Sequence, residues 1–162
     1  MWEKRNMWAI GGLREIGFKP NSDLLMVLSS QGRGVFDCIK DEKIARDHFD
    51  YYAEKWDSDL GIVEGIGILK NENIKCGGFE APDILKKETE DHWIIEIKSE
   101  IRPNWQQKEL KADVMYLQNR KTKESIEIAV FHYGIDRSYG FSDTGNSFVV
   151  GTASDITIWN RK

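Results

Sequence analysis

The chain has 162 residues, of which 40% are hydrophobic and 11% aromatic, and this is enough apolar material for one sizeable core. Its formal net charge of −4 argues against a general nucleic-acid binder, whose affinity would rest on a basic surface that neutralises phosphates. We therefore predict a single domain over residues 1–162, with a basic protein as the partner that its charge suits.

The N-terminal residues and the cysteines indicate the cellular compartment of the protein. The first residues, MWEKRNMWAIGG, lack the apolar run of a signal peptide, and the longest uninterrupted apolar run in the chain is Leu24 to Leu28. Such a run is far too short to span a membrane. Cys38 and Cys76 are isolated and have no C-x-x-C partner, which favours small buried thiols in a reduced protein. We expect a cytoplasmic protein without a membrane span.

The stretch from Ile16 to Asp47 predicts a four-strand β meander. Turn-forming residues at 19–23, 29–32 and 40–42 separate short apolar or alternating runs. The run Leu24 to Leu28 is continuously apolar, which is typical of a strand that is buried on both faces.

A partial copy of this stretch lies at the other end of the chain, from Ser138 to Asn160. With a constant offset of 123 and no gap, Gly17-Phe18 falls on Gly140-Phe141 and Val35-Phe36-Asp37 on Ile158-Trp159-Asn160. Such self-similarity indicates two copies of one supersecondary unit.

The order of these residues resembles the blades of WD-repeat and related β-propellers. Each copy carries Gly-Phe, a polar turn, a hydrophobic strand and then an aromatic residue followed by Asp or Asn. The Gly-His dipeptide of that family is absent, and about 40 residues per blade leave room for fewer than four blades. The predicted fold is therefore mainly β (α+β), with antiparallel meanders forming a small barrel, a sandwich or a partial propeller that a homodimer would complete.

Two segments between the copies carry helical signals. Ala45, Phe49, Tyr52 and Trp56 recur at helical spacing, which predicts one amphipathic helix near residues 43–57. Residues 106–118 fit either a helix or a strand, whereas 92–98 and 126–133 have the composition of strands.

One motif of the centre has the residues of a metal-dependent nuclease. Pro82-Asp83 precedes Glu96-Ile97-Lys98, which resembles the PD-(D/E)xK motif. That resemblance implies that Asp83 and Glu96 hold Mg²⁺ while Lys98 polarises the attacking water at a nucleic-acid phosphate. A helix at 106–118 followed by a strand at 126–133 would match the family's core. Alternatively, Glu96 and Lys98 are only the solvent face of a strand, where opposite charges flank one another.

We prefer a non-catalytic binding protein without a cofactor. The centre is locally acidic, and Trp105 lies in a polar loop where it would serve as an anchor while carboxylates steer a basic partner. Immunity-type inhibitors of nucleic-acid-cleaving toxins have a similar size and charge. The residues predicted to bind are Glu80, Glu88, Glu90, Asp91 and Trp105.

Overall fold

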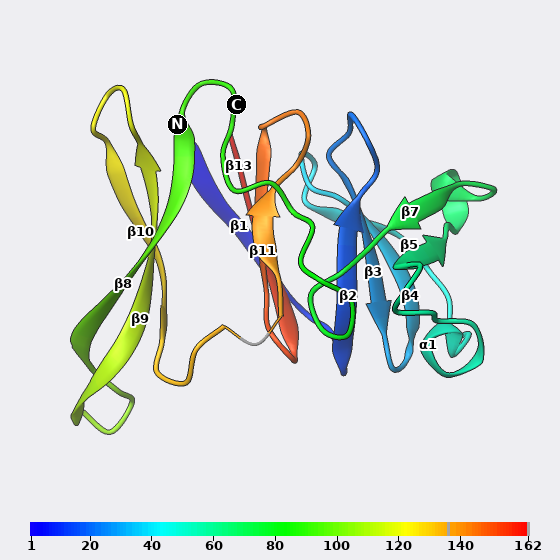
Figure 1. The fold of residues 1–162 in the computed structure, drawn as a ribbon, viewed down its shortest axis with the longest axis horizontal. Coiled ribbons are helices and arrows are strands. Elements are labelled where there is room, and N and C mark those ends of the chain that lie inside the picture. Colours follow the sequence, from blue (N-terminus) through cyan, green and yellow to red (C-terminus); the bar gives the residue numbers. More distant parts are fainter. Residues whose placement is uncertain (136, 162) are drawn as a thin grey trace. The chain divides into compact units, whose positions relative to one another are not determined.

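A computed structural model describes residues 1–135 and 137–161 of the chain (Figure 1). The protein is mainly β and consists of antiparallel sheets, which confirms the predicted fold class. The described chain divides into two compact units, one formed by residues 1–86 and 137–161 (unit 1) and the other by residues 87–135 (unit 2). Compact units need not fold separately, so the single domain over 1–162 stays a prediction.

The first sheet of unit 1 is the meander predicted for residues 16–47. Its strands pair antiparallel in the order β2-β3-β4-β5. Their bounds are β2 (Leu13–Phe18), β3 (Leu24–Ser29), β4 (Gly32–Asp37) and β5 (Glu42–Arg46). The turn residues that separate the apolar runs in the sequence separate the strands here.

The second sheet of unit 1 contains the predicted copy and has the strand order β1-β13-β12-β11. Its strands are β11 (Tyr139–Phe141), β12 (Ser147–Gly151), β13 (Asp155–Arg161) and β1 (Trp2–Ala9). The copy supplies only three strands, and the N-terminal strand β1 completes the sheet by pairing with β13.

The two copies share backbone hydrogen bonds as well as strand positions. Lys19 N donates to Leu24 O at 2.9 Å, and the pair 123 residues later, Ser142 N and Ser147 O, is bonded at 3.0 Å. The bond from Cys38 N to Asp23 O likewise recurs between Arg161 N and Asn146 O, at 3.1 Å in both copies. The repeat therefore extends to the geometry of the turns.

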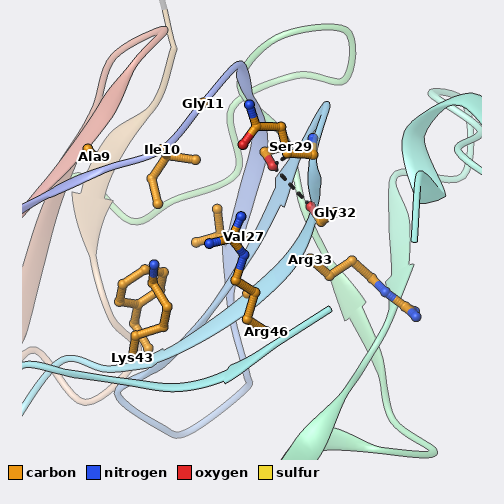
Figure 2. A pocket seen from close by; sticks show the side chains of 12 residues that line it. Ala9, Ile10, Gly11, Val27, Ser29, Gly32, Arg33, Lys43 and Arg46 are labelled. Atoms are coloured by element: carbon orange, nitrogen blue, oxygen red, sulfur yellow. Dashed lines mark hydrogen bonds between the residues drawn. The ribbon is translucent and has the colours of Figure 1, made fainter. Parts of the chain in front are cut away.

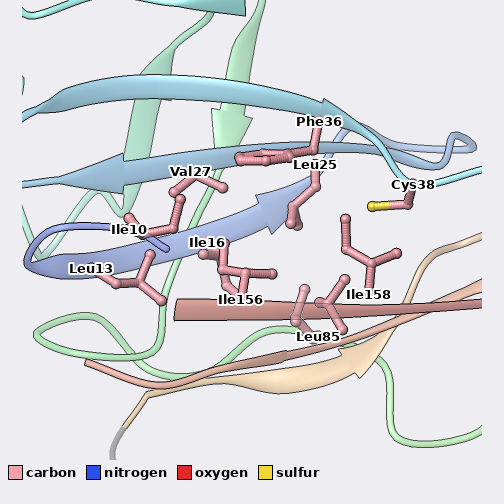
Figure 3. Packing of buried hydrophobic residues seen from close by; sticks show 11 residues of the cluster. Ile10, Leu13, Ile16, Leu25, Val27, Phe36, Cys38, Leu85, Ile156 and Ile158 are labelled. Atoms are coloured by element: carbon pink, nitrogen blue, oxygen red, sulfur yellow. The ribbon is translucent and has the colours of Figure 1, made fainter. Parts of the chain in front are cut away.

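The two sheets of unit 1 share a core (Figure 3). The first sheet faces it with Leu25, Val27 and Phe36, whereas the second sheet faces it with Val149, Ile156 and Ile158. Adding 123 shows that these are different positions of the repeat: Leu25, for example, corresponds to Phe148, which is buried outside this core. The copies therefore stack in the same sense, each presenting a different face, and not as mirror images across the core.

The other face of the first sheet is covered by residues 51–76. This segment contains α1 (Tyr51–Glu54), β6 (Ile62–Glu64), the 3-10 turn η1 (Gly67–Leu69) and β7 (Asn73–Lys75). Met26, Leu28 and Val35 pack there against apolar side chains of the segment. Strand β3 is therefore buried on both faces, as predicted. Within the covering segment, the short strand β6 is followed by η1.

The helix predicted near 43–57 is confirmed only over Tyr51–Glu54, where the side chain of Asp50 caps it. Its first part is strand β5 instead, because residues 42–46 alternate between exposed and half-buried positions and pair with β4. The sheet edge offered by β4 thus overrides the helical spacing of the apolar side chains. None of the described helices has the length and apolar composition needed to cross a membrane.

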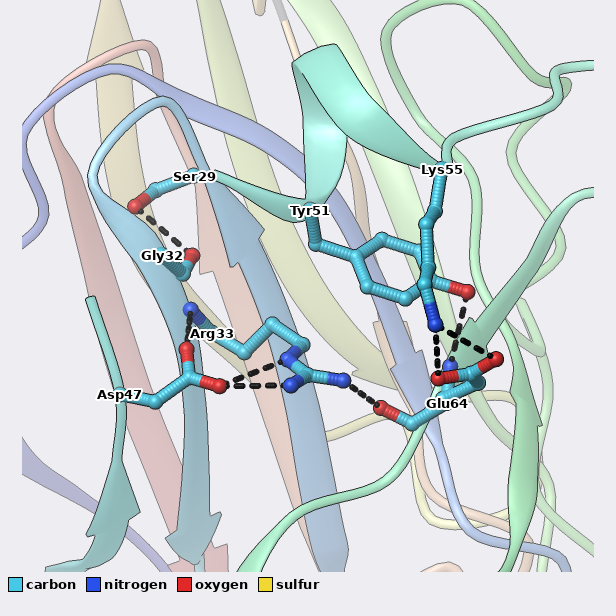
Figure 4. Close-up of polar contacts among 7 residues, drawn as sticks. All are labelled: Ser29, Gly32, Arg33, Asp47, Tyr51, Lys55 and Glu64. Atoms are coloured by element: carbon cyan, nitrogen blue, oxygen red, sulfur yellow. Dashed lines mark hydrogen bonds and ion pairs between the residues drawn. The ribbon is translucent and has the colours of Figure 1, made fainter. Parts of the chain in front are cut away.

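Arg33 connects β4 to this covering segment (Figure 4). Its guanidinium bonds Asp47 Oδ2 through Nε at 2.9 Å and Nη2 at 2.6 Å, and Nη1 donates to Glu64 O at 2.8 Å. Its central carbon also lies 4.9 Å from the centre of the Tyr51 ring. All three nitrogens of the guanidinium are therefore used within unit 1.

Residues 75–86, which we term the strap, run along the open edges of both sheets of unit 1. Ile16 of β2 forms a bridge with Gly77, and Phe141 of β11 forms one with Lys86. An uncovered edge strand would present free backbone groups to other chains. The strap occupies these edges in both copies.

Unit 2 is a three-stranded antiparallel meander in the order β10-β9-β8. Its strands are β8 (Trp93–Pro103), β9 (Glu109–Asn119) and β10 (Ser125–Phe131). The ambiguous residues 106–118 thus lie in a turn and in strand β9. The helix that the nuclease hypothesis requires at this place is not formed.

Candidate binding surface

The β8–β9 hairpin of unit 2 carries the aromatic residue that the sequence predicts as an anchor. Its strands pair without a bulge from Trp93 opposite Asn119 to Pro103 opposite Glu109. The side chain of Asn104 holds the turn, because its Oδ1 accepts hydrogen bonds from Gln106 N at 2.9 Å and Lys108 N at 3.0 Å. Asparagine suits this position because its short amide bonds the backbone two residues on.

Trp105 projects from this turn with 86% of its surface exposed. Ile101, four residues earlier on β8, is 63% exposed, and Ile97 shares its side of the strand and is also exposed. Side chains two apart on a strand point to the same face. The hairpin therefore offers a large aromatic ring and a short apolar row, and exposed apolar groups of this kind mark contact sites when they gather.

The opposite side of β8 carries a row of alternating charges: Glu96, Lys98, Glu100 and Arg102. Arg102 Nη2 contacts Glu100 Oε2 at 2.9 Å, Glu127 Oε2 at 2.7 Å and the Tyr116 hydroxyl at 3.1 Å. It thereby bonds to all three strands of unit 2. Because these groups are partly exposed, we assign the cluster to alignment of the strands more than to their stability.

The same cluster shifts the ionisation of its members. The hydrogen bond from the Tyr116 hydroxyl to Glu100 Oε1, 2.7 Å long, is the main cause of a lowered pKa of Glu100, and Arg102 adds to it. That bond also raises the pKa of Tyr116. Near neutral pH the cluster is thus held as a charged carboxylate beside a neutral phenol.

Three of the predicted acidic residues precede β8 in unit 2. Glu88 pairs with Arg120 at 3.2 Å, and Asp91 Oδ1 accepts the Thr89 hydroxyl at 2.7 Å. Glu90 is exposed. Arg120 therefore offsets the charge of Glu88, which reduces the contribution of Glu88 to long-range attraction of a basic protein.

Glu80 belongs to unit 1, within the strap. Its N–H donates to the buried carboxylate of Glu15 at 2.6 Å, next to the bond from Phe79 N at 2.9 Å. Its side chain bonds Tyr52, and this bond, after burial, helps to raise the pKa of Tyr52 to about 12. In the structure Glu80 helps to hold the strap.

The residues of the nuclease hypothesis are divided between the units. Asp83 lies in the strap and accepts the Ser138 hydroxyl at 2.6 Å. Glu96 and Lys98 share one side of β8, with their charged atoms 3.2 Å apart. Across residues 1–135 and 137–161, no three His, Cys, Asp or Glu side chains gather as they would around a metal ion. The Mg²⁺ site stays a hypothesis without a structural observation that favours it.

Sequence reasoning missed Arg102, Tyr116, Glu127 and the buried Glu15. For Arg102, the alternation Glu-x-Lys-x-Glu-x-Arg from 96 to 102 was a usable signal, because it continues the strand past Lys98. For Glu15, no local pattern marks a carboxylate that bonds a loop 64 residues away.

Comparisons with protein-family models, with curated proteins and with solved structures gave no match. The case for a function rests on the residues and contacts described above.

Proposed function

We propose that the chain is a non-catalytic protein-binding module that contacts its partner with the β8–β9 hairpin. The observation that carries the proposal is Trp105, 86% exposed at the tip of a turn that Asn104 holds in place. A rigid tip lowers the entropy lost on binding, and tryptophan is enriched among the few residues that contribute most of the binding energy near the centre of protein interfaces.

The partner that suits this chain is a basic protein. The net charge of −4 attracts such a partner over distance, although several carboxylates of unit 2 have local basic neighbours. An inhibitor of a basic toxin-like protein would be a function of this kind. A reducing, cytoplasmic compartment would suit the two buried free cysteines, Cys38 and Cys76.

The test compares Trp105→Ala with Tyr133→Ala, which removes another exposed aromatic ring from unit 2. The full tagged chain and both variants are used to isolate partners from the source cells, and the affinity of each recovered partner is then measured at low and high salt. We expect Trp105→Ala to weaken binding at least about tenfold and Tyr133→Ala to leave it unchanged. A partner bound equally by both variants, or no partner at all, would refute the proposal.

A further inference from the structure

A cavity of about 100 Å³ opens in unit 1 between residues 9–11 and strands β3, β4 and β5 (Figure 2). Its wall includes Lys43 and Arg46, both from β5, and Figure 2 shows Arg46 reaching from that strand toward Val27. The cavity has room for several water molecules. It is independent of the hairpin in unit 2.

The charge around this cavity is positive. Arg33, Lys43 and Arg46 line it, and its lining includes no Asp or Glu. Asp47 neutralises Arg33, as Figure 4 shows. Lys43 and Arg46 form no ion pair with any residue of the described chain, so within residues 1–135 and 137–161 no carboxylate neutralises these two positive charges.

Lys43 and Arg46 are held differently. The Lys43 ammonium lies 5.5 Å from the centres of the Trp8 and Phe36 rings, which fixes its position while leaving its N–H groups unbonded. The side chain of Arg46 makes no hydrogen bond to any described residue, and its planar guanidinium can donate two parallel hydrogen bonds to an oxyanion.

Two further features leave the cavity open and polar. Gly34 contributes no side chain, and a Cβ there would only reach ordinary contact with Phe36 at 3.5 Å and Ala45 O at 3.8 Å. The Gln31 amide covers Gly11, where a Cβ would come within 2.6 Å of its Nε2. Gln31 therefore adds neutral N–H donors at the rim.

We propose that this cavity binds a small oxyanion, a phosphate or a carboxylate, between Lys43 and Arg46. The two cations supply charge-assisted hydrogen bonds, the Gln31 amide adds a neutral donor, and the glycine at position 34 provides the volume. Phosphate and carboxylate groups are only a few atoms across, which matches the space.

The test is titration of the full chain with inorganic phosphate and, separately, with acetate, at constant ionic strength maintained with chloride. Calorimetry gives the affinity, and amide NMR shifts give the location. We expect one of the two anions to bind and to shift the amides of Gln31 and of residues 43–46. Binding by phosphate alone or by acetate alone identifies the chemical class.

Three variants make the test specific. Arg46→Gln removes the free guanidinium from an exposed side chain and should weaken binding about tenfold or more, because hydrogen bonds to charged groups are the strong ones. Gly34→Val fills the cavity without changing the charge and should also abolish binding. Lys40→Gln removes an exposed lysine that does not line the cavity and should have no effect. No binding by either anion, or equal binding by Arg46→Gln and wild type, would overturn the proposal.

Discussion

The two sheets of unit 1 share a repeat, yet they differ in what completes them. The first sheet contains its own fourth strand, β5, whereas the second takes β1 from the far end of the chain. Equivalent positions of the two copies consequently make different contacts. Asp37 bonds the N–H groups of its own turn, while its equivalent Asn160 donates to Cys38 O and Ile39 O of the first sheet. Asp37 thus bonds within its own turn, whereas Asn160 connects the second sheet to the first.

At the strap, in contrast, equivalent residues of the two copies make similar contacts. Arg14 and Arg137, which are 123 residues apart, place their guanidinium carbons 4.9 and 4.1 Å from the centre of the Phe79 ring. Glu15 accepts hydrogen bonds from the strap backbone, and the equivalent Ser138 donates to Asp83 of the strap. Both copies of the repeat therefore hold the strap in place through equivalent positions. The likeness of the repeat to propeller blades stays a prediction.

The equivalent glycines of the two copies give the largest expected effect. A Cβ on Gly17 would collide with the backbone carbonyl of Lys75, whereas a Cβ on Gly140 would lie 2.5 Å from the Leu85 side chain and 2.6 Å from Lys86 O. We expect Gly17→Ala to lower the free energy of unfolding by about 3 kcal/mol or more, and Gly140→Ala by about 1–2 kcal/mol, because the overlap with the strap is smaller at Gly140.

Denaturation in guanidinium chloride measures both glycine variants. Gly134→Ala shows the cost of a positive φ without any overlap, which concerns Gly140 but not Gly17, because a Cβ at Gly134 would meet nothing within 4 Å while its φ is +84°. Two unchanged midpoints would mean that the strap does not pack on β2 and β11 as described.

Asn160 and Asp37 test the difference between the copies. Asn160→Ala leaves the carbonyls of Cys38 and Ile39 and the Nε of Arg5 without their partner, and we expect a loss of about 2 kcal/mol. Asp37→Ala loses bonds in an exposed turn and should cost about 1 kcal/mol or less. Thermal and chemical denaturation provide the comparison, and equal losses in the two variants would contradict the assigned roles.

The pH dependence of the free energy of unfolding tests the contribution of Glu15. Its equivalent in the other copy, Ser138, does not titrate. Burial raises the pKa of Glu15 above its usual 4.5, against the bonds from Phe79, Glu80 and Ala81 that lower it. The folded protein therefore binds this proton more tightly than the unfolded chain, so the contribution of Glu15 to stability falls as the pH rises from about 4.5 through the raised pKa.

We expect Glu15→Gln to remove this part of the decline, as measured by the free energy of unfolding at a series of pH values. Glu90→Gln makes the same chemical change on an exposed side chain and should keep the wild-type profile. A decline that persists in Glu15→Gln would show that other groups cause it.

For the candidate site, the sequence determined the exposed Trp105 but not its surroundings. Trp105 follows Asn104 in a polar turn, and this local chemistry is sufficient to predict a loop. The cluster around Arg102 depends on the register of three strands, and the cavity beside Arg46 depends on how residues 9–11 lie against strands β3, β4 and β5. Neither arrangement is local in sequence.

For the fold, the sequence by itself determined the repeat, its turns and the strand buried on both faces, because turn chemistry and apolar runs act over a few residues. Only the tertiary structure decided that β1 would complete the second sheet, that the copies would stack in the same sense and that the strap would cover both edges. It also decided against a long helix at 43–57, since pairing with β4 outweighed the helical spacing of Ala45 and its neighbours. These outcomes depend on contacts between residues far apart in the chain, which local patterns do not encode.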